Sequence, residues 1–208
     1  MKKKKKNLVF DLGGVILPLN RPRAERAFAS LNPARIEQAT LLIDQERLFD
    51  RFEMGEMSEQ VFLDRLISVS ETEEARVRKA WDAILEPIPG RHMNLLSHLA
   101  EQYNLYLLSN TNSLHMAWIE HHLAVDHAMP RFGGVFTTLF LSFEMGTRKP
   151  HPDIYALTQN QIGCTADEIW FVDDNLDNVQ AARTAGWEAV LHPANDPLEN
   201  SVSSLLEG

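Results

Sequence analysis

Side chains that could bind a phosphate group and a metal ion follow several short apolar runs of this sequence. Each run has the length and composition of a buried strand, and the polar residues come at its carboxyl end. Ligands of open parallel α/β sheets bind beyond the carboxyl ends of the strands, so we expect these residues to meet in one site. They are Asp11, Ser109, Asn110, Asp173 and Asp174, with Lys149 in the loop after a further run.

Together these residue types supply what phosphoryl transfer requires, although each alone is an ordinary turn or loop residue. Asp11 is a candidate nucleophile, and the other carboxylates could hold Mg²⁺. A hydroxyl and backbone N–H groups could bind phosphate oxygens, while a lysine offsets negative charge. Three converging carboxylates would repel one another strongly without a cation. We therefore expect a metal ion at this site.

Short strands and helices alternate along most of the chain, which is typical of a parallel sheet with helices on both faces. The expected strands are Asn7–Phe10, Leu105–Leu108, Val135–Leu141, Ile169–Val172 and Trp187–Leu191. From about Arg21 to Leu85 the apolar residues recur at helical spacing instead. The sequence therefore predicts an α/β fold: a Rossmann-like parallel-sheet core with a small helical insertion after the first strand.

Four ordered segments resemble the motifs of the haloacid dehalogenase superfamily. They are Phe-Asp11-Leu-Gly-Gly-Val, Leu-Ser109-Asn-Thr-Asn, Arg148-Lys149-Pro and Phe-Val-Asp173-Asp-Asn-Leu-Asp177-Asn. The resemblance runs from residue 7 to about residue 186. It implies a catalytic core over residues 1–17 and 89–208, with a helical cap of the subclass I type over residues 18–88. The wording of the second and fourth segments is most similar to bacterial α-D-glucose-1-phosphate phosphatases.

The resemblance implies how the matching residues would handle the phosphoryl group. Asp11 would be the nucleophile that forms an aspartyl-phosphate, which water then hydrolyses. Lys149 would neutralise charge on Asp11 and on the phosphoryl group. Ser109 and the backbone N–H of Asn110 would bind phosphate oxygens.

The resemblance also implies a magnesium site. Asp11, the backbone carbonyl of Gly13 and Asp174 would hold Mg²⁺, with Asp173 acting through a bound water. Asp177 would orient Lys149 or the metal-bound waters; alternatively, it is simply an acid in the first turn of a helix, where it would interact favourably with the helix dipole.

One position departs from the pattern of the superfamily. Its phosphatases usually carry a second Asp two residues after the nucleophile, as general acid and later base, and here that position is Gly13. A positioned acid is worth about 10²–10⁴-fold in rate. Either the leaving group needs little protonation, or a cap residue supplies the proton, or the protein is slow. Glucose-1-phosphate phosphatases share the Asp-x-Gly pattern, which favours the first explanation.

The residues thus predict an Mg²⁺-dependent phosphomonoester hydrolase acting on a small phosphorylated metabolite, such as a sugar phosphate like glucose 1-phosphate. An alternative is a 2-haloacid dehalogenase, which uses the same nucleophile without Mg²⁺. The fourth motif of those enzymes reads Ser-Ser-Asn, so the pair Asp173-Asp174 favours phosphate and metal. A catalytically weak, phosphate-binding protein of the same fold is a further alternative because of Gly13.

The cap is expected to have an aromatic core and to select the substrate. Its core residues at helical spacing are Phe49, Phe52 and Phe62. Guesses at cap residues that face Asp11 are Arg47, Glu53 and Met54.

Composition narrows the possible partners. The 208 residues include 20 basic and 29 acidic ones, for a net charge of −9. Without the run Lys2–Lys6, the rest of the chain has 15 basic residues and 29 acidic ones. A protein with so large an excess of negative charge is expected to repel nucleic acid. No apolar stretch has the length of a membrane span, and the lone Cys164 excludes an internal disulfide. We expect a cytoplasmic monomer or homodimer that binds neither nucleic acid nor membranes.

Overall fold

The computed structural model describes residues 7–129, 132 and 134–207, so the run Lys2–Lys6 lies outside the described residues. A five-stranded sheet with the order β3-β2-β1-β4-β5 forms its centre, and every pairing is parallel. The strands are β1 (Asn7–Phe10), β2 (Asn104–Ser109), β3 (Thr138–Leu141), β4 (Ile169–Asp173) and β5 (Glu188–Leu191). The predicted α/β, Rossmann-like core is confirmed.

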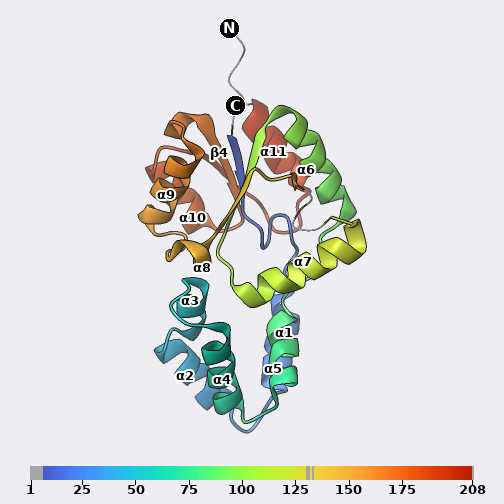
Figure 1. Ribbon diagram of the computed structural model, residues 1–208, viewed down its shortest axis with the longest axis vertical. Coiled ribbons are helices and arrows are strands. Elements are labelled where there is room, and N and C mark those ends of the chain that lie inside the picture. The colour runs from blue at the N-terminus through green and yellow to red at the C-terminus, as the bar shows by residue number, and fades with distance from the viewer. Residues whose placement is uncertain (1–6, 130–131, 133, 208) are drawn as a thin grey trace.

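Helices cover both faces of this sheet (Figure 1). Side chains of successive strand residues point to opposite faces, so Leu8 and Phe10 pack on one side and Val9 on the other. The first face is covered by α6 (Gly90–Gln102), α7 (Ser113–His127) and α11 (Leu198–Glu207). The second is covered by α9 (Pro152–Ile162) and α10 (Leu176–Thr184), and the short 3-10 helix η2 (Ala166–Glu168) lies between α9 and β4.

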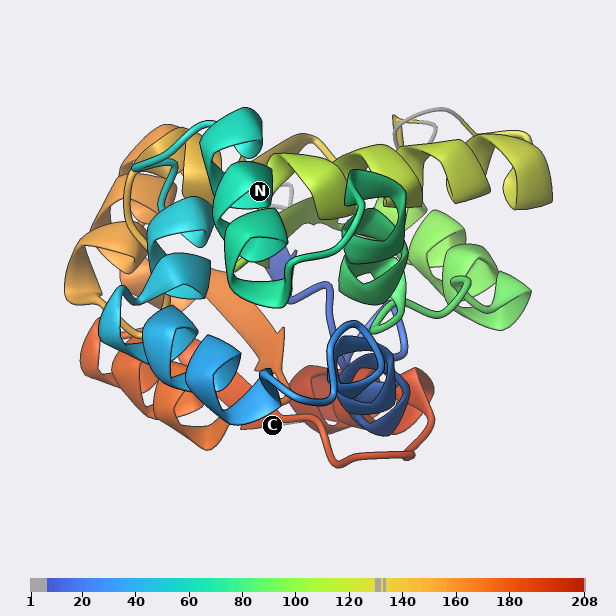
Figure 2. The ribbon, with the colours of Figure 1, turned by 90° about the horizontal axis from the view of Figure 1, so that it is seen from below.

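The segment between β1 and α6 is helical, as predicted, and lies below the carboxyl ends of the strands (Figures 1 and 2). Its helices are α1 (Arg21–Ala29), α2 (Ile36–Gln45), α3 (Leu48–Glu53), α4 (Glu59–Ser70) and α5 (Glu74–Asp82). They share an apolar cluster. In it the rings of Phe52 and Phe62 stack with their centroids 4.1 Å apart, and the ring centroids of Phe49 and Trp81 lie 5.0 Å apart. The aromatic core expected for the cap is confirmed.

Two neighbouring chain segments connect the cap to the core. The N–H of Asn20 donates to the carbonyl of Ile84 at 2.7 Å, and the N–H of Glu86 donates to the carbonyl of Pro18 at 3.1 Å. The chain thus leaves and re-enters the core side by side, close to the predicted boundaries at residues 17–18 and 88–89. Those boundaries stay a prediction.

The cap also rests on the core at two further places. Helix α3 meets the short helix α8 (Ser142–Met145), where a side chain at Gly55 would lie 2.2 Å from the carbonyl oxygen of Phe143. Near α7, the indole Nε1 of Trp81 donates to Asn112 Oδ1 at 3.3 Å, and the Trp81 ring stacks on His115.

Strand β3 is shorter than the sequence predicts. Val135 donates its N–H to the carbonyl of Phe132 in a turn, and the pairing of β3 with β2 begins at Thr138. The apolar side chains before Thr138 pack against the core from this turn: Phe132 is buried and meets the Phe136 ring edge-on. The apolar run therefore predicted correctly which side chains are buried. The strand itself begins three residues later than expected, because the pairing with β2 begins only at Thr138. Within the described residues, no helix is long and apolar enough to span a membrane.

Candidate active site

The strand register brings the predicted residues to one edge of the sheet. Phe10 pairs with Leu107 of β2 and with Val172 of β4, so Asp11, directly after β1, lies level with Asp173, the last residue of β4. The N–H of Asp11 donates to the carbonyl of Val172, which continues the pairing by one residue. The two carboxylates therefore face the same space beyond the sheet.

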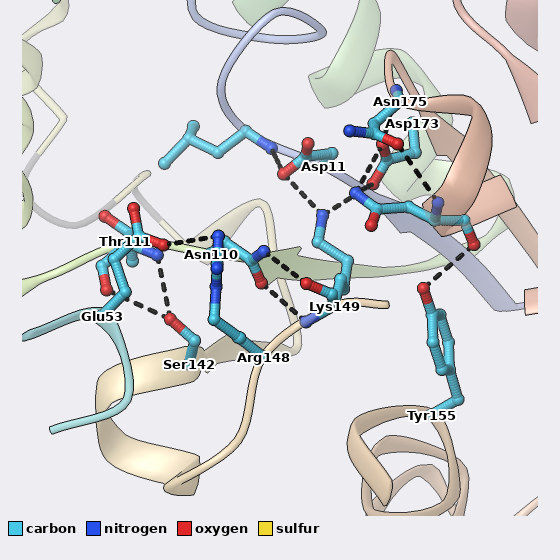
Figure 3. Close-up of polar contacts among 12 residues, drawn as sticks. Asp11, Glu53, Asn110, Thr111, Ser142, Arg148, Lys149, Tyr155, Asp173 and Asn175 are labelled. Carbon is cyan, nitrogen blue, oxygen red and sulfur yellow. Dashed lines mark hydrogen bonds and ion pairs between the residues drawn. The ribbon is translucent and has the colours of Figure 1, made fainter. Parts of the chain in front are cut away.

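Lys149 fills the space between these two carboxylates (Figure 3). Its Nζ lies 2.8 Å from Asp11 Oδ1 and 2.7 Å from Asp173 Oδ2. The Lys149 side chain is 1% exposed and that of Asp173 is fully buried. Burial alone would lower the pKa of Lys149, but the charges of Asp11 and Asp173 outweigh it and raise that pKa. The lysine is therefore charged, and it compensates for two buried acids.

Asp174 adds a third carboxylate to the site. Asp11, Asp173 and Asp174 each offer an oxygen within 4.8 Å of the others. Burial raises the pKa of Asp11 to about 7 and also raises that of Asp174, and in both cases the charge of Asp173 adds to the rise. A set of hard oxygen donors with excess negative charge fits a divalent cation such as Mg²⁺, which binds through one or two carboxylates plus phosphate and water oxygens.

Gly14 makes room for Asp174. Its φ is +82°, and a Cβ at this position would lie 2.2 Å from Asp174 Oδ2. Any other residue would be strained in this conformation and would push the carboxylate away. A glycine is therefore required at position 14, because the loop after β1 passes so close to the carboxylate of Asp174.

The motif after β2 holds the lysine loop in place. The side chain of Asn110 accepts the Lys149 N–H at 2.8 Å and donates to the Lys149 carbonyl at 2.9 Å. Ser109 is buried at the end of β2, and Gly13 lies in the turn after Asp11. The structure thus brings Asp11, Lys149, Asp173 and Asp174 into contact range, whereas the individual roles of Ser109, Asn110 and Gly13 stay predictions.

One polar contact was missed from the sequence. The side chain of Asn178, on α10, donates to both Asp173 oxygens, at 3.0 and 3.1 Å, whereas Asp177 is exposed in the first turn of the same helix. Neighbouring helix residues point about 100° apart, so only one of the two can face the strand. Asn178 shares its face with the buried Ala182, and this four-residue spacing was the available signal.

A cavity of about 610 Å³ lies within the cap, between α1 and the helices α2 to α5. Phe28, Phe49 and Trp81 contribute apolar surface, and Arg21 and Glu53 are among its charged lining residues. Arg21 is close enough for its charge to lower the pKa of Asp174, and Lys149 likewise acts on the pKa of Glu53. Two of its lining residues, Arg21 and Glu53, thus interact electrostatically with charged groups of the site, although Asp11, Lys149, Asp173 and Asp174 do not themselves line the cavity.

Arg148, the residue before Lys149, pairs with two acids of α3. Its guanidinium contacts Asp50 through Nη1, and Nη2 lies 2.9 Å from Glu53 Oε2. Burial raises the pKa of Glu53, and the charge of Arg148 opposes that rise. Of the three cap residues guessed from the sequence, Glu53 lies on the cavity wall. The side chain of Arg47 is 67% exposed and pairs with Asp50, and Met54 is the residue directly after α3.

The family model for haloacid dehalogenase-like hydrolases matches residues 5–186, nearly the whole chain. The chain belongs to the haloacid dehalogenase-like hydrolases. This assignment confirms the family that the four motifs predicted, and it confirms that the protein is a hydrolase.

Similar haloacid dehalogenase proteins extend the comparison. D-ribitol-5-phosphate phosphatase of Bacteroides thetaiotaomicron is 29% identical over 185 residues, which cover 88% of this chain and 89% of that protein. A haloacid dehalogenase family enzyme of the same organism, in complex with magnesium and inorganic phosphate, is 30% identical with a TM-score of 0.81. That comparison covers 93% of this chain and 97% of the other.

A haloacid dehalogenase that acts on a different class of compound also has this fold. L-2-haloacid dehalogenase of Xanthobacter autotrophicus is 22% identical, with a TM-score of 0.60, over 99% of this chain and 84% of that one. This likeness concerns the fold alone, so the choice between phosphate esters and haloacids depends on the site.

Proposed function

We propose that this protein is an Mg²⁺-dependent phosphomonoesterase that acts on a small phosphorylated metabolite through an aspartyl-phosphate on Asp11. The observation that carries the proposal is the buried Lys149, which lies between Asp11 and Asp173 in a cluster completed by Asp174. A haloacid carries one carboxylate and needs no metal, whereas a phosphate dianion and three acids need a metal ion as well as the lysine. The similarity to a phosphatase supports the same choice.

In the proposed reaction, a carboxylate oxygen of Asp11 attacks phosphorus in line with the leaving oxygen, which departs with the electrons of the P–O bond. Lys149 offsets the charge shared by Asp11 and the phosphoryl group, and the Ser109 hydroxyl and Asn110 N–H hold phosphate oxygens. Bound Mg²⁺, held by Asp11, Asp174 and the Gly13 carbonyl, would supply further charge stabilisation. Water then attacks phosphorus and breaks its bond to Asp11, which is released as the carboxylate. One water proton stays on the inorganic phosphate and the other neutralises the departed leaving oxygen.

The leaving group must manage without the usual acid. Gly13 has no carboxyl, and the adjacent space is filled by Leu19, whose Cδ1 would lie 3.1 Å from a Cβ at position 13. An anomeric phosphate such as glucose 1-phosphate has a leaving group of low basicity, which supports that candidate. Ribitol 5-phosphate is the second candidate, because of the named relative. The proposal also includes a cytoplasmic location and a monomeric or homodimeric state, both of which stay predictions from the sequence.

The test is hydrolysis of four compounds with Mg²⁺ or with EDTA. p-Nitrophenyl phosphate, whose leaving group needs no acid, glucose 1-phosphate and ribitol 5-phosphate report phosphatase activity, and chloroacetate reports dehalogenation. We expect phosphate release that requires Mg²⁺, fastest for a sugar or polyol phosphate. Release of chloride, or phosphate release that EDTA leaves unchanged, would overturn the proposal.

A further inference from the structure

Arg21 is a charged cap residue that lies near the carboxylate cluster and has no partner of its own. It is the first residue of α1, it is exposed, and it lines the cap cavity. Within the described part of the chain, its guanidinium group forms no hydrogen bond or ion pair. Burial raises the pKa of Asp174, and the charge of Arg21 is among those that oppose this rise. The guanidinium group is therefore accessible, unpartnered and within electrostatic range of the site.

The start of α1 is held beside the position of the missing acid. The side chain of Leu19 lies against Gly13, where its Cδ1 would be 3.1 Å from a Cβ. The next residue, Asn20, is fixed by its side chain, which donates to Glu86 Oε1 at 2.8 Å. Arg21 follows directly. Its side chain therefore starts close to the space into which an acid at position 13 would project.

The leaving oxygen of the proposed reaction must point toward the cap. Asp11 attacks from the carboxyl edge of the sheet, and in-line displacement places the leaving oxygen on the opposite side of phosphorus. The cap lies beyond that edge (Figure 1). The other phosphate oxygens are expected to bind Lys149, Ser109 and the Asn110 N–H on the core side. A charged donor of the cap therefore approaches the leaving oxygen rather than these three.

We propose that Arg21 donates a hydrogen bond to the leaving oxygen and stabilises the negative charge that develops on it as the P–O bond breaks. This inference rests on the proposed phosphatase function, and it assigns to Arg21 part of the task of the acid that Gly13 lacks. The oxygen departs with both electrons of its bond to phosphorus and takes its proton from water. The guanidinium group keeps its own protons, because arginine does not deprotonate in proteins.

Other charged groups close to the site are less suited to this task. Glu53 also lines the cavity, but it is an acid and forms an ion pair with Arg148 at 2.9 Å. Lys149 is held between Asp11 and Asp173. Arg21 combines a positive charge with hydrogen-bond donors that no other described residue uses.

Two aryl phosphates that differ in the basicity of the leaving oxygen test this contact. p-Nitrophenyl phosphate releases a weakly basic phenolate, whereas phenyl phosphate releases a more basic one from the same ring. Neither leaving group carries a hydroxyl that could bind elsewhere in the cap. Loss of a donor to the leaving oxygen should therefore slow phenyl phosphate more. The readout is the ratio of kcat/KM for phenyl phosphate to that for p-nitrophenyl phosphate, measured with saturating Mg²⁺.

Arg26 provides a matched control for Arg21. It lies on the same helix and is also exposed, but it does not line the cavity. We expect Arg21→Gln to lower the ratio about fivefold or more. Arg26→Gln should leave the ratio within about twofold of the wild-type value. Because the Arg21 side chain is exposed and unpartnered, Arg21→Gln should fold normally, which its melting temperature checks.

Three results would overturn the inference. The first is an unchanged ratio in Arg21→Gln, which includes an equal loss of activity toward both esters, since Arg21 would then bind the phosphate group instead. The second is an equal fall of the ratio in both variants. The third is a wild-type protein that hydrolyses p-nitrophenyl phosphate but not phenyl phosphate, a result that leaves the proposed function standing. If the wild-type protein releases phosphate from no ester, the proposed function fails and this inference fails with it.

Discussion

The catalytic centre and the cap opposite it are held by different kinds of contact. Asp11 directly follows β1 and Asp173 ends the neighbouring β4, while the side chain of Asn110 fixes the main chain of Lys149, so the main-chain positions are set at all three charged residues. The cap meets the core through side chains, among them Arg148 with its acids and Trp81 against α7. The comparison indicates that the sheet and its loops position the carboxylates and Lys149, whereas the cap is docked by side-chain contacts that can change without moving them.

The largest effect is expected at the centre. Asp11→Asn removes the proposed nucleophile, so kcat/KM for p-nitrophenyl phosphate should fall by at least about 10³-fold, measured with saturating Mg²⁺. Asp167→Asn, which changes an exposed acid in η2, should keep the wild-type rate. Comparable activity in Asp11→Asn and wild type would show that Asp11 is not the nucleophile.

A smaller effect on activity is expected where Gly14, in the loop after β1, lies against Asp174. Gly14→Ala places a Cβ against Asp174, so the Mg²⁺ concentration for half-maximal activity should rise about 10-fold or more. Gly163→Ala is the matched control, since Gly163 also has a positive φ, of +72°, but open space around it. If both variants need the same Mg²⁺ concentration, Asp174 is not a metal ligand.

The smallest effect is expected in the cap. Burial raises the pKa of Asp82, the last residue of α5, to about 6, although Arg78 and His122 lower it. A carboxyl whose folded pKa is raised stabilises the fold below its unfolded pKa of about 3.9, and that stabilisation is lost as the pH rises through about 6.

Asp82→Asn should therefore raise the melting temperature at pH 8 and leave it unchanged at pH 4. Because the side chain is partly exposed, the gain in free energy of unfolding should stay below about 1 kcal/mol. Asp64→Asn, on the exposed face of α4, controls for the loss of one charge. An equal gain at both pH values would rule out the titration of Asp82 as the cause.

The same contrast explains what the sequence could predict. The strands, their polar ends and the cluster around Lys149 were predictable because a short apolar run followed by an acid is a local pattern. The parallel sheet then brings such ends together by topology. Asn178 was missed because Asp177, its neighbour, matches the family motif equally well, and only the buried face of α10 separates the two.

The cap contacts could not be derived in this way. Arg148 and its partners Asp50 and Glu53 are nearly 100 residues apart, and their pairing depends on how α3 docks on the core. No local pattern encodes that docking, because the apolar positions of a cap helix indicate its buried face but not its distance from Lys149. The sequence therefore gave no physical reason to choose Glu53, and its contact with Arg148 and its place on the cavity wall come from the structure.

The most direct test of the central claim is the stereochemical course at phosphorus. Hydrolysis of a phosphate ester made chiral with oxygen isotopes proceeds through two in-line displacements if Asp11 first takes the phosphoryl group. Because each displacement inverts the configuration, the account predicts net retention in the released phosphate. Inversion would mean a single direct attack by water and would contradict the aspartyl-phosphate intermediate.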